Sequence, residues 1–228
     1  MVSKNEQVNK DYWEKNIEGF SGFYDTKSEE NIQAPGFFAA LYKGLAFPME
    51  KKYMLARYNF VCNYIDENVK PGMKVADIGC GSGVYTKRMI SKGAFVYATD
   101  YVESAISLTR KNLTKDEVRS VELLHSDVVK QAIPKVDLAI SIGVLPYIDE
   151  ADKYFGNILP FTDLFLFNFL DKNNLFNRLR SLMPLFDVRS YSYHSSSAIN
   201  SHLENHGFGI RLQETLATGF LMDVKKAK

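Results

Sequence analysis

The chain of 228 residues has little of what marks secreted, membrane-spanning or zinc-binding proteins. Its two cysteines, Cys62 and Cys80, are too few for a disulfide framework or a zinc site. No apolar run approaches the roughly 18 residues of a membrane-spanning helix. The opening residues, MVSKNEQVNK, lack the apolar core of a signal peptide. We therefore expect a cytoplasmic protein with no metal site and no membrane partner.

Charge of either sign is not in excess, since 28 Lys and Arg face 27 Asp and Glu. Broad electrostatic attraction to nucleic acid or to an anionic surface is thus excluded, and we expect no nucleic-acid partner. Internal repeats and low-complexity segments are also missing. With 46% hydrophobic residues the chain is long enough for one sizeable core. Neither the composition nor the charge of the chain indicates an oligomeric state.

The most informative stretch is 74–85, KVADIGCGSGVY, which predicts a strand, a tight turn and a helix that begins near Ser82. Three glycines spaced two apart let the backbone turn sharply and approach a ligand where a Cβ would collide: Gly79, Gly81 and Gly83. An ordinary strand-to-helix turn can also be rich in glycine. The polar residues farther along the chain therefore decide whether this turn binds a ligand or only connects a strand to a helix.

A dinucleotide site is the rival interpretation of these glycines. Its fingerprint, G-x-G-x-x-G, needs a third glycine three positions after the second, where this chain has Val84. The observed spacing thus disfavours a cofactor whose pyrophosphate binds at the helix N-terminus.

The spacing D-x-G-C-G-x-G over residues 77–83 resembles the first motif of class I S-adenosylmethionine-dependent methyltransferases. The resemblance covers residues 72–148 by specific motifs and the remainder by the order of elements. It implies an α/β fold with a Rossmann-like, seven-stranded, mostly parallel sheet, a terminal antiparallel hairpin and a helical N-terminal cap. The implied cofactor is S-adenosylmethionine.

The order of the expected helices and strands divides the chain into two regions. Residues 1–70 predict a helical, aromatic-rich cap or lid, with its clearest helix from Pro48 to the stop at Pro71 and Gly72. Residues 71–228 predict the core, because strands and helices alternate from Gly72 onward. We expect parallel strands at 74–79, 94–99, 121–125, 136–142 and 164–169, an inserted segment at 172–196, and a hairpin from 208–216 and 220–224.

Ligands of open α/β sheets bind at the carboxyl ends of the strands. Asp100 and Asp127 end the second and third strands there, although an Asp at one strand end is commonly a turn residue. The resemblance implies that Asp100 holds the ribose and Asp127 the adenine amino group. The complete set of cofactor residues that it implies is Asp77, Gly79, Cys80, Gly81, Gly83, Asp100, Tyr101, Val102, Asp127, Val128, Ile142 and Gly143.

Within that set, the implied roles differ from residue to residue. Asp77 orders the turn, and Gly79 and Gly81 line the methionine portion. The backbone of Cys80 touches the cofactor, whereas its thiol has no chemical role. The remaining implied contacts are with adenine (Tyr101, Val102 and the backbone of Val128) and with the sulfonium (Ile142 and Gly143).

The candidate catalytic residues are His194 and Tyr147. His194, with an ordinary pKa of about 6.5, suits proton removal near neutrality, but a surface histidine is an equally good interpretation. Tyr147 ends the run G-V-L-P-Y and either positions an acceptor or packs. That run lacks the Asn or Asp of the proline-tyrosine motif in amino-methylating enzymes, which disfavours a nucleobase amine as acceptor. We expect His125 to be structural, and His202 and His206 to be solvated.

The acceptor is expected between the cap and the inserted segment. Tyr24 in the cap and Tyr191 and Tyr193 in the insertion are candidate pocket walls, and Arg189 is a candidate partner for an acidic group. Arg178 and Arg180 are further candidates, and solvated helix faces explain all three arginines equally well. This concentration of aromatic residues favours a small organic acceptor.

The sequence thus predicts an S-adenosylmethionine-dependent methyltransferase that acts on an oxygen or nitrogen of a small organic acceptor. The alternatives are an NAD-dependent oxidoreductase and a non-catalytic protein that binds or senses S-adenosylmethionine. The identity of the acceptor does not follow from these residues.

Overall fold

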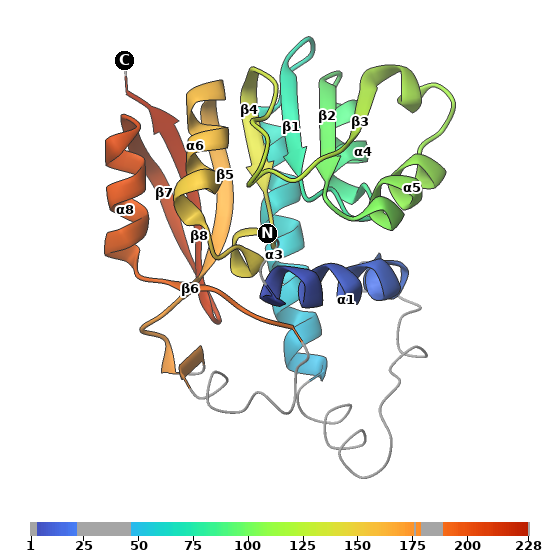
Figure 1. Cartoon of the computed structure of the whole chain (residues 1–228). Coiled ribbons are helices and arrows are strands. Elements are labelled where there is room, and N and C mark those ends of the chain that lie inside the picture. Colours follow the sequence, from blue (N-terminus) through green and yellow to red (C-terminus); the bar gives the residue numbers. More distant parts are fainter. Residues whose placement is uncertain (1–3, 22–46, 176, 179–188, 228) are drawn as a thin grey trace, which may run out of the picture.

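The structure is a computed structural model that describes residues 4–21, 47–175, 177–178 and 189–227 (Figure 1). The predicted lid segment around Tyr24 and the predicted anion partner Arg180 lie outside the described residues. Among the described helices, none is both long and apolar enough to cross a membrane.

The sheet has the order β3-β2-β1-β4-β5-β8-β7. β1 pairs in parallel with β2 and β4, and the pairs β2–β3 and β4–β5 are parallel as well. β8 is antiparallel to both β5 and β7. This topology confirms the predicted fold class. The strands are β1 Lys74–Ile78, β2 Phe95–Asp100, β3 Val121–His125, β4 Val136–Ser141, β5 Thr162–Asp171, β7 Phe208–Leu216 and β8 Gly219–Lys226.

A short eighth strand, β6 (Tyr193–His194), was not expected from the sequence and pairs in parallel with the end of β5. The segment before it is held by the backbone, because Ser192 N donates to Pro146 O over 2.8 Å. The described end of the insertion therefore lies along the carboxyl end of the sheet.

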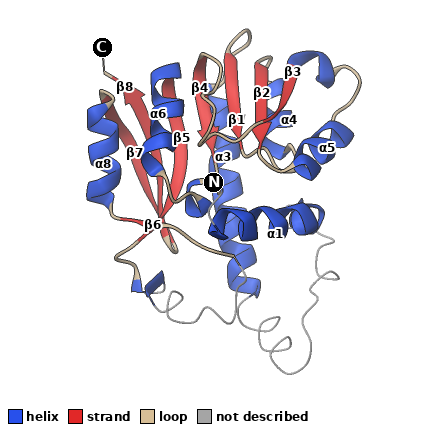
Figure 2. Ribbon diagram, in the orientation of Figure 1, coloured by secondary structure: helices blue, strands red, loops and turns tan. Residues whose placement is uncertain are grey.

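Helices cover both faces of the sheet (Figure 2). α3, α4 and α5 supply side chains to one apolar core, and α6 and α8 supply side chains to the other. The helices are α1 Lys4–Ser21, α3 Phe47–Asn68, α4 Val84–Ser91, α5 Glu103–Asn112, α6 Ala151–Ile158 and α8 Ser196–Asn205, with 3₁₀ turns η4 Glu117–Ser120, η5 Leu145–Tyr147 and η6 Leu159–Phe161.

The central strands are apolar on both faces because both faces are covered. In β1, Val75 packs in the core under α3 and α4, whereas Ala76 and Ile78 pack in the core under α6. Phe165 and Phe167 of β5 are fully buried in the latter core as well. This two-sided burial explains why the strands appear in the sequence as nearly unbroken apolar runs.

The helix after the glycine turn begins later than the sequence predicts. We expected it near Ser82, but α4 begins at Val84, and its N-cap is Gly83 with φ of +79°. The left-handed backbone of Gly83 is incompatible with helix, which delays the helix start.

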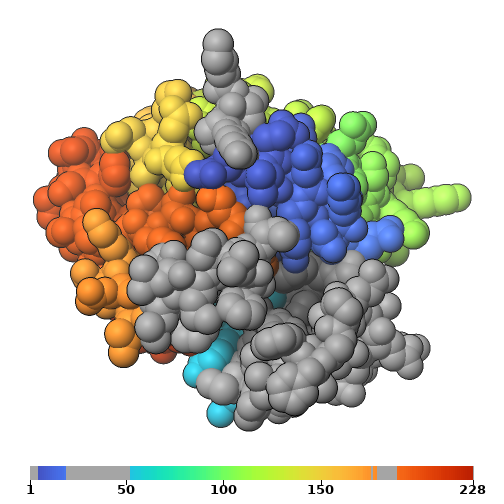
Figure 3. All heavy atoms as spheres, turned by 60° about the horizontal axis from the view of Figure 1, so that its bottom comes forward, coloured from blue at the N-terminus to red at the C-terminus, as the bar shows by residue number. Residues whose placement is uncertain are grey.

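α1 crosses the edge of the sheet at which the parallel strands end (Figure 1). Viewed from that edge, α1 lies between the segment that follows residue 189 and the helix α5 (Figure 3). The carboxyl ends of the strands, where the sequence places every candidate site residue of the core, are thus covered by a segment from the start of the chain.

Candidate functional site

The glycine turn after β1 is held by β2 and α5. Gly79 N donates to Thr99 O over 2.8 Å, and Thr109 Oγ1 donates to Gly81 O over 2.9 Å. Gly79, Gly81 and Gly83 all have positive φ. A Cβ on Gly79 would lie 2.3 Å from Val144 Cγ2, so the turn also needs glycine for space.

Asp77 lies under this turn and is 2% exposed. Its carboxylate accepts a hydrogen bond from Thr86 Oγ1, which ties the end of β1 to α4. Burial raises the pKa of Asp77 to about 6, against the effect of the Thr86 hydrogen bond. The location fits the predicted role of ordering the turn, and the buried carboxylate has no exposed face for a ligand.

Asp100 ends β2 beside the turn. Its Oδ2 accepts from Gly81 N over 3.1 Å, and its Oδ1 accepts from Val102 N over 3.0 Å. Burial raises the pKa of this carboxyl to about 6, with a smaller contribution from the charge of Glu14. Each carboxylate oxygen has a second acceptor position. The backbone N–H of Tyr101 also hydrogen-bonds this carboxylate, so fewer positions remain for the hydroxyl groups of a ligand.

Asp127, at the end of the third strand, is held in a different way. Its Oδ1 accepts from Val129 N over 3.0 Å, and its Oδ2 lies 2.5 Å from Lys130 Nζ. Lys130 Nζ is also 2.8 Å from Glu6 Oε1 on α1. Sequence reasoning missed Lys130, which joins this strand end to the helix above it. Val128, the next candidate, is buried in the core under α6.

A buried amide that the sequence analysis missed fixes the end of β4. Asn168 of β5 is 3% exposed, and its Oδ1 accepts from Gly143 N over 2.6 Å. Gly143 has φ of +79°, and Ile142 beside it is half-buried. The one polar residue in the apolar run LFLFNF was the indication, since a buried amide needs hydrogen-bond partners.

Tyr101 lies between the residues around Asp100 and those around Tyr147. Burial raises the pKa of its hydroxyl, and the charge of Asp100 and the nearby Tyr147 and Asp127 raise it further. Its carbonyl lies 3.1 Å from His125 Nε2, which agrees with a structural role for that histidine. Tyr101 thus lies among residues from the ends of three different strands.

Aromatic rings from three distant segments form a contiguous group, which we call the aromatic group: Tyr12, Trp13, Tyr147, Tyr191 and Tyr193. Centroid distances are 5.2 Å for Tyr12–Trp13, 5.5 Å for Trp13–Tyr147, 5.4 Å for Tyr147–Tyr191 and 6.5 Å for Tyr191–Tyr193. The structure therefore brings the three predicted tyrosines together. It adds Tyr12 and Trp13 of α1, which the sequence marked only as part of an aromatic cap.

Arg189 lies against two rings of the aromatic group. Its Cζ is 5.1 Å from the ring centroid of Tyr12 and 5.3 Å from that of Tyr191, within the range of cation–π attraction. Asn9 makes a second link between α1 and this segment, because its side chain exchanges two hydrogen bonds with the backbone of Ser190 over 2.9 and 2.8 Å. Arg178 is exposed and lies outside this group.

His194 has different neighbours. Burial lowers the pKa of its imidazole, as does His202 on α8, while Asp149 and a backbone hydrogen bond to Leu145 act in the opposite direction. Its Nε2 is buried with no hydrogen-bond partner among the described residues. The ring is thus not that of a solvated surface histidine, and none of these neighbours belongs to the aromatic group.

The two histidines of α8 were expected to be solvated, and this expectation is wrong for His202. Its ring stacks on Phe155 at 5.0 Å and lies 3.4 Å from Asp152 Oδ1. His206 Nδ1 lies 2.8 Å from His202 O near the helix end. The stacking arises because α6 and α8 pack side by side on one face of the sheet. In the part of the chain that the structure describes, no three His, Cys, Asp or Glu side chains gather as a metal site would require.

Comparison with known proteins gives a match to the family described as a methyltransferase domain over residues 69–169. Ribosomal protein L11 methyltransferase of Caldanaerobacter subterraneus subsp. tengcongensis is 34% identical over 79 residues, which are 34% of this chain and 26% of that protein. The mitochondrial ubiquinone biosynthesis O-methyltransferase of Schizosaccharomyces pombe is 28% identical over 97 residues, 41% of this chain and 35% of that protein. The chain thus spans well under half the length of these curated relatives.

Among solved structures, magnesium protoporphyrin IX methyltransferase from Synechocystis PCC 6803 with bound SAH is similar with a TM-score of 0.71 and 18% identity. The similarity covers 98% of this chain and 100% of that one. At this level of identity the likeness concerns the fold. Residues 69–169 thus match a methyltransferase domain, and the strand order and the likeness to this solved structure show the class I methyltransferase fold.

Proposed function

We propose that this protein transfers a methyl group from S-adenosylmethionine, the donor, to an oxygen or nitrogen of a small organic acceptor. The observation that carries the proposal is the position of Asp100 beside the glycine turn, where the backbone N–H groups of Gly81 and Val102 orient its carboxylate. The ribose of the donor offers two adjacent hydroxyl groups, for which a carboxylate is a suitable acceptor. When bound, the donor supplies an electrophilic methyl group on a sulfonium.

The residues of the chain divide into two sides under this proposal. The donor side consists of Asp77, Gly79, Gly81 and Asp100, with adenine contacts from Tyr101, Val102, Asp127 and Val128. Gly79 and Gly81 let the backbone approach the methionine portion. Asp127 is proposed to meet the adenine amino group, and Lys130 would have to share that carboxylate. Ile142 and Gly143 line the place next to the sulfonium, where Asn168 fixes the backbone.

The acceptor side is the aromatic group with Arg189. Flat aromatic walls suit a planar, partly apolar molecule, and an arginine between two rings suits an acidic group on it. Tyr147 is proposed to position the acceptor, because its ring lies between Trp13 and Tyr191. His194 is proposed as the general base, and its ionisable neighbours are His202 on α8 and Asp149 before α6. The chain's main contribution would be alignment and exclusion of water.

The names of the relatives differ in the acceptor that they indicate. One name gives ribosomal protein L11, and another gives ubiquinone biosynthesis. A small acceptor is favoured here by the aromatic group under α1. An NAD-dependent oxidoreductase is disfavoured, because the third glycine of the dinucleotide fingerprint is replaced by Val84. A non-catalytic binding protein would share the donor side and differ only in turnover.

The first test is a titration of the protein with S-adenosylhomocysteine in a calorimeter, with NAD as the comparison. We expect S-adenosylhomocysteine alone to bind. Asp100→Ala should weaken its binding by about 1.5–3 kcal/mol, since hydrogen bonds to a charged group are lost. Asp163→Ala, an exposed carboxylate on β5, is the matched control and should bind as the wild type does. Unchanged affinity in Asp100→Ala would remove the assigned role.

The acceptor requires a search rather than a titration. Cell extract incubated with the protein and labelled donor should yield a small molecule heavier by one methyl group, detected by mass spectrometry. A labelled protein or nucleic acid as the product would overturn the small-molecule proposal and leave the donor side untouched. Donor binding without any labelled product would favour the non-catalytic alternative.

A further inference from the structure

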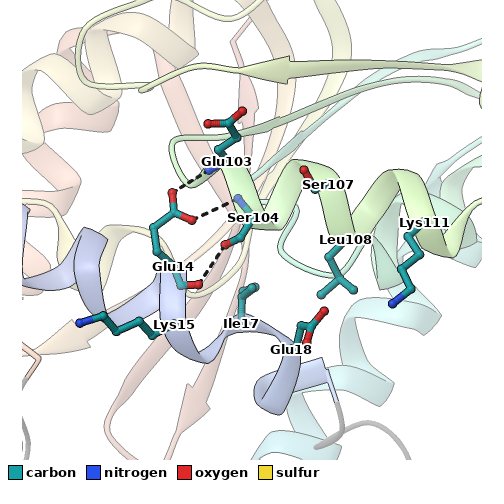
Figure 4. Close-up of a pocket in the computed structure, with 9 residues that line it drawn as sticks. All are labelled: Glu14, Lys15, Ile17, Glu18, Glu103, Ser104, Ser107, Leu108 and Lys111. Carbon is teal, nitrogen blue, oxygen red and sulfur yellow. Dashed lines mark hydrogen bonds between the residues drawn. The ribbon is translucent and has the colours of Figure 1, made fainter.

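Glu14 of helix α1 is hydrogen-bonded to the first turn of α5. Its Oε1 accepts from Glu103 N over 3.0 Å, and its Oε2 accepts from Ser104 N over 3.2 Å. Ser104 Oγ also donates to the backbone carbonyl of Glu14 over 3.3 Å. Figure 4 shows these three bonds between the two helices. Glu14 therefore binds two of the N–H groups that the first turn of α5 leaves unpaired.

The carboxylate of Glu14 is well held in this position. Burial alone would raise its pKa, but the hydrogen bonds from Ser104 and from the two backbone N–H groups outweigh burial, and the pKa is lowered from its ordinary value. A negative charge at a helix N-terminus is also favoured by the helix dipole. Glu14 is thus ionised and bonded to α5 at neutral pH.

One turn of α1 farther on, Ile17 covers the glycine turn. A Cβ placed on Gly81 would meet Ile17 Cδ1 at 3.7 Å, which is van der Waals contact. Asp100 lies close by, hydrogen-bonded to Gly81 N, and is only 8% exposed. Ile17 thus lies next to Gly81, the residue whose N–H binds Asp100, on the side that faces α1.

A hollow of about 620 Å³ lies between α1 and α5, and Ile17 is one of the residues that line it. Figure 4 shows the side chains of the two helices that surround it. Glu14 lines it as well, so the side chain that binds α5 is part of the wall of the hollow. The lining residues are Glu14, Lys15, Ile17, Glu18, Glu103, Ser104, Ser107, Leu108 and Lys111.

We propose that Glu14 is a positioning residue that latches α1 over the donor side, and that the donor enters and leaves past Ile17 through this hollow when the latch opens. The inference rests on the proposed function, because it presumes that the donor binds at Asp100. Glu14 touches neither the donor nor the acceptor in this scheme. It acts through α1, which forms the outer wall of the donor side.

The test measures how fast S-adenosylhomocysteine dissociates, by stopped-flow displacement with excess S-adenosylmethionine. Glu14→Ala should dissociate roughly tenfold faster than the wild type, because hydrogen bonds to a charged group are lost. Glu14→Gln keeps one carbonyl acceptor and should lie between the two. Ile17→Ala should speed both association and dissociation. Asp11→Ala, an exposed carboxylate on the same helix that does not line the hollow, is the matched control and should leave both rates within about twofold.

A second measurement needs no ligand. Hydrogen exchange at the amides of Glu103 and Ser104 should be slow in the wild type and at least tenfold faster in Glu14→Ala. A variant whose dissociation rate and amide exchange match the wild type, even with a lower melting temperature, would overturn the latch. Should Glu14→Ala fail to fold, Glu14→Gln and Ile17→Ala decide the question. Failure of the proposed function is distinguished by a wild type that does not bind S-adenosylhomocysteine at all.

Discussion

The donor side and the aromatic group lie at the same edge of the sheet but are built in different ways. Most of the donor side comes from one stretch of chain, residues 77–102, to which the segments after β3 and β4 add a few residues, and its geometry is fixed mostly by backbone hydrogen bonds to Asp100 and to the glycine turn. The aromatic group comes from α1, from η5 and from residues 189–194, and side-chain rings make its contacts. The donor side is therefore local in sequence, whereas the aromatic group exists only after the chain has folded.

This difference has a consequence for the effects of substitutions. A change in the donor side alters backbone that is already rigid, so its effect should be large and confined to donor binding. A change in the aromatic group removes one of several rings, and the remaining rings still form a wall. We expect smaller effects there, directed at the acceptor. α1 is the exception, because it contributes to both sides through Ile17 and Trp13.

The largest effect is expected for Gly79→Ala. The new Cβ would overlap Val144 Cγ2 and would have to adopt φ of +73°, so we expect a loss of about 2–4 kcal/mol in the free energy of unfolding and no measurable donor binding. Gly81→Ala is the control, since its Cβ meets only Ile17 at ordinary contact distance. Urea unfolding and calorimetry should show a much smaller loss of stability for Gly81→Ala. Equal losses in the two variants would contradict the steric explanation.

The next largest effect concerns turnover. If His194 is the general base, His194→Ala should lower kcat by roughly 10²-fold with donor affinity nearly unchanged. If its ring only packs, the melting temperature should fall while kcat per folded molecule stays within about threefold of the wild type. His206→Ala is the histidine control. Steady-state kinetics with the acceptor found in extract, together with thermal unfolding, separates the two roles.

A pH profile tests the donor side with no substitution at all. Burial raises the pKa of Asp100 to about 6, and a protonated carboxyl accepts ribose hydroxyls less well. Donor affinity should thus be constant above pH 7 and fall by about tenfold per unit well below pH 6. Asp100→Asn should lose this dependence. A wild-type affinity that does not change down to pH 5 would contradict the assignment.

The stability of the unliganded protein should depend on pH in the opposite sense. A carboxyl whose folded pKa lies above its unfolded value binds protons more tightly when folded, so its contribution to stability is complete below the unfolded value of 3.8 and is lost as pH rises through about 6. Asp77, with a pKa also raised to about 6, contributes with the same sign. Thermal unfolding between pH 4 and 7 measures this contribution, and Asp77→Asn should remove the part that comes from Asp77.

The smallest effect is expected in the aromatic group. Trp13→Ala removes edge-to-face ring contacts with Tyr12 and Tyr147, each worth about 0.5–1.5 kcal/mol. KM for the acceptor should rise by a few-fold, and donor affinity should be unchanged. Val8→Ala, at a partly exposed position on the same helix, is the control. A loss of donor affinity equal to the rise in KM would show that the two sides are not separate.

Much of the core could be predicted because the patterns that specify its strands and helices lie within short stretches of sequence. Strand and helix limits from residue 72 onward agree with the structure within a few residues, since buried runs, glycine stops and acidic strand ends lie next to each other in sequence. The part of the site between β1 and β2 was identified for the same reason. The short strand β6 was not predicted, because two residues carry no periodic pattern and pair only where β5 extends past its neighbours.

The sequence by itself determined the glycine turn, because three positive-φ positions at fixed spacing restrict the backbone whatever surrounds it. It also determined the placement of Asp100 and Asp127 at strand ends. Only the tertiary structure decided what lies above them: Glu14 on the first turn of α5, Lys130 between Glu6 and Asp127, and Trp13 against Tyr147. The contacts that α1 makes here join residues about 90 to more than 130 positions apart, and no local pattern specifies them, because they depend on how α1 crosses the edge of the finished sheet.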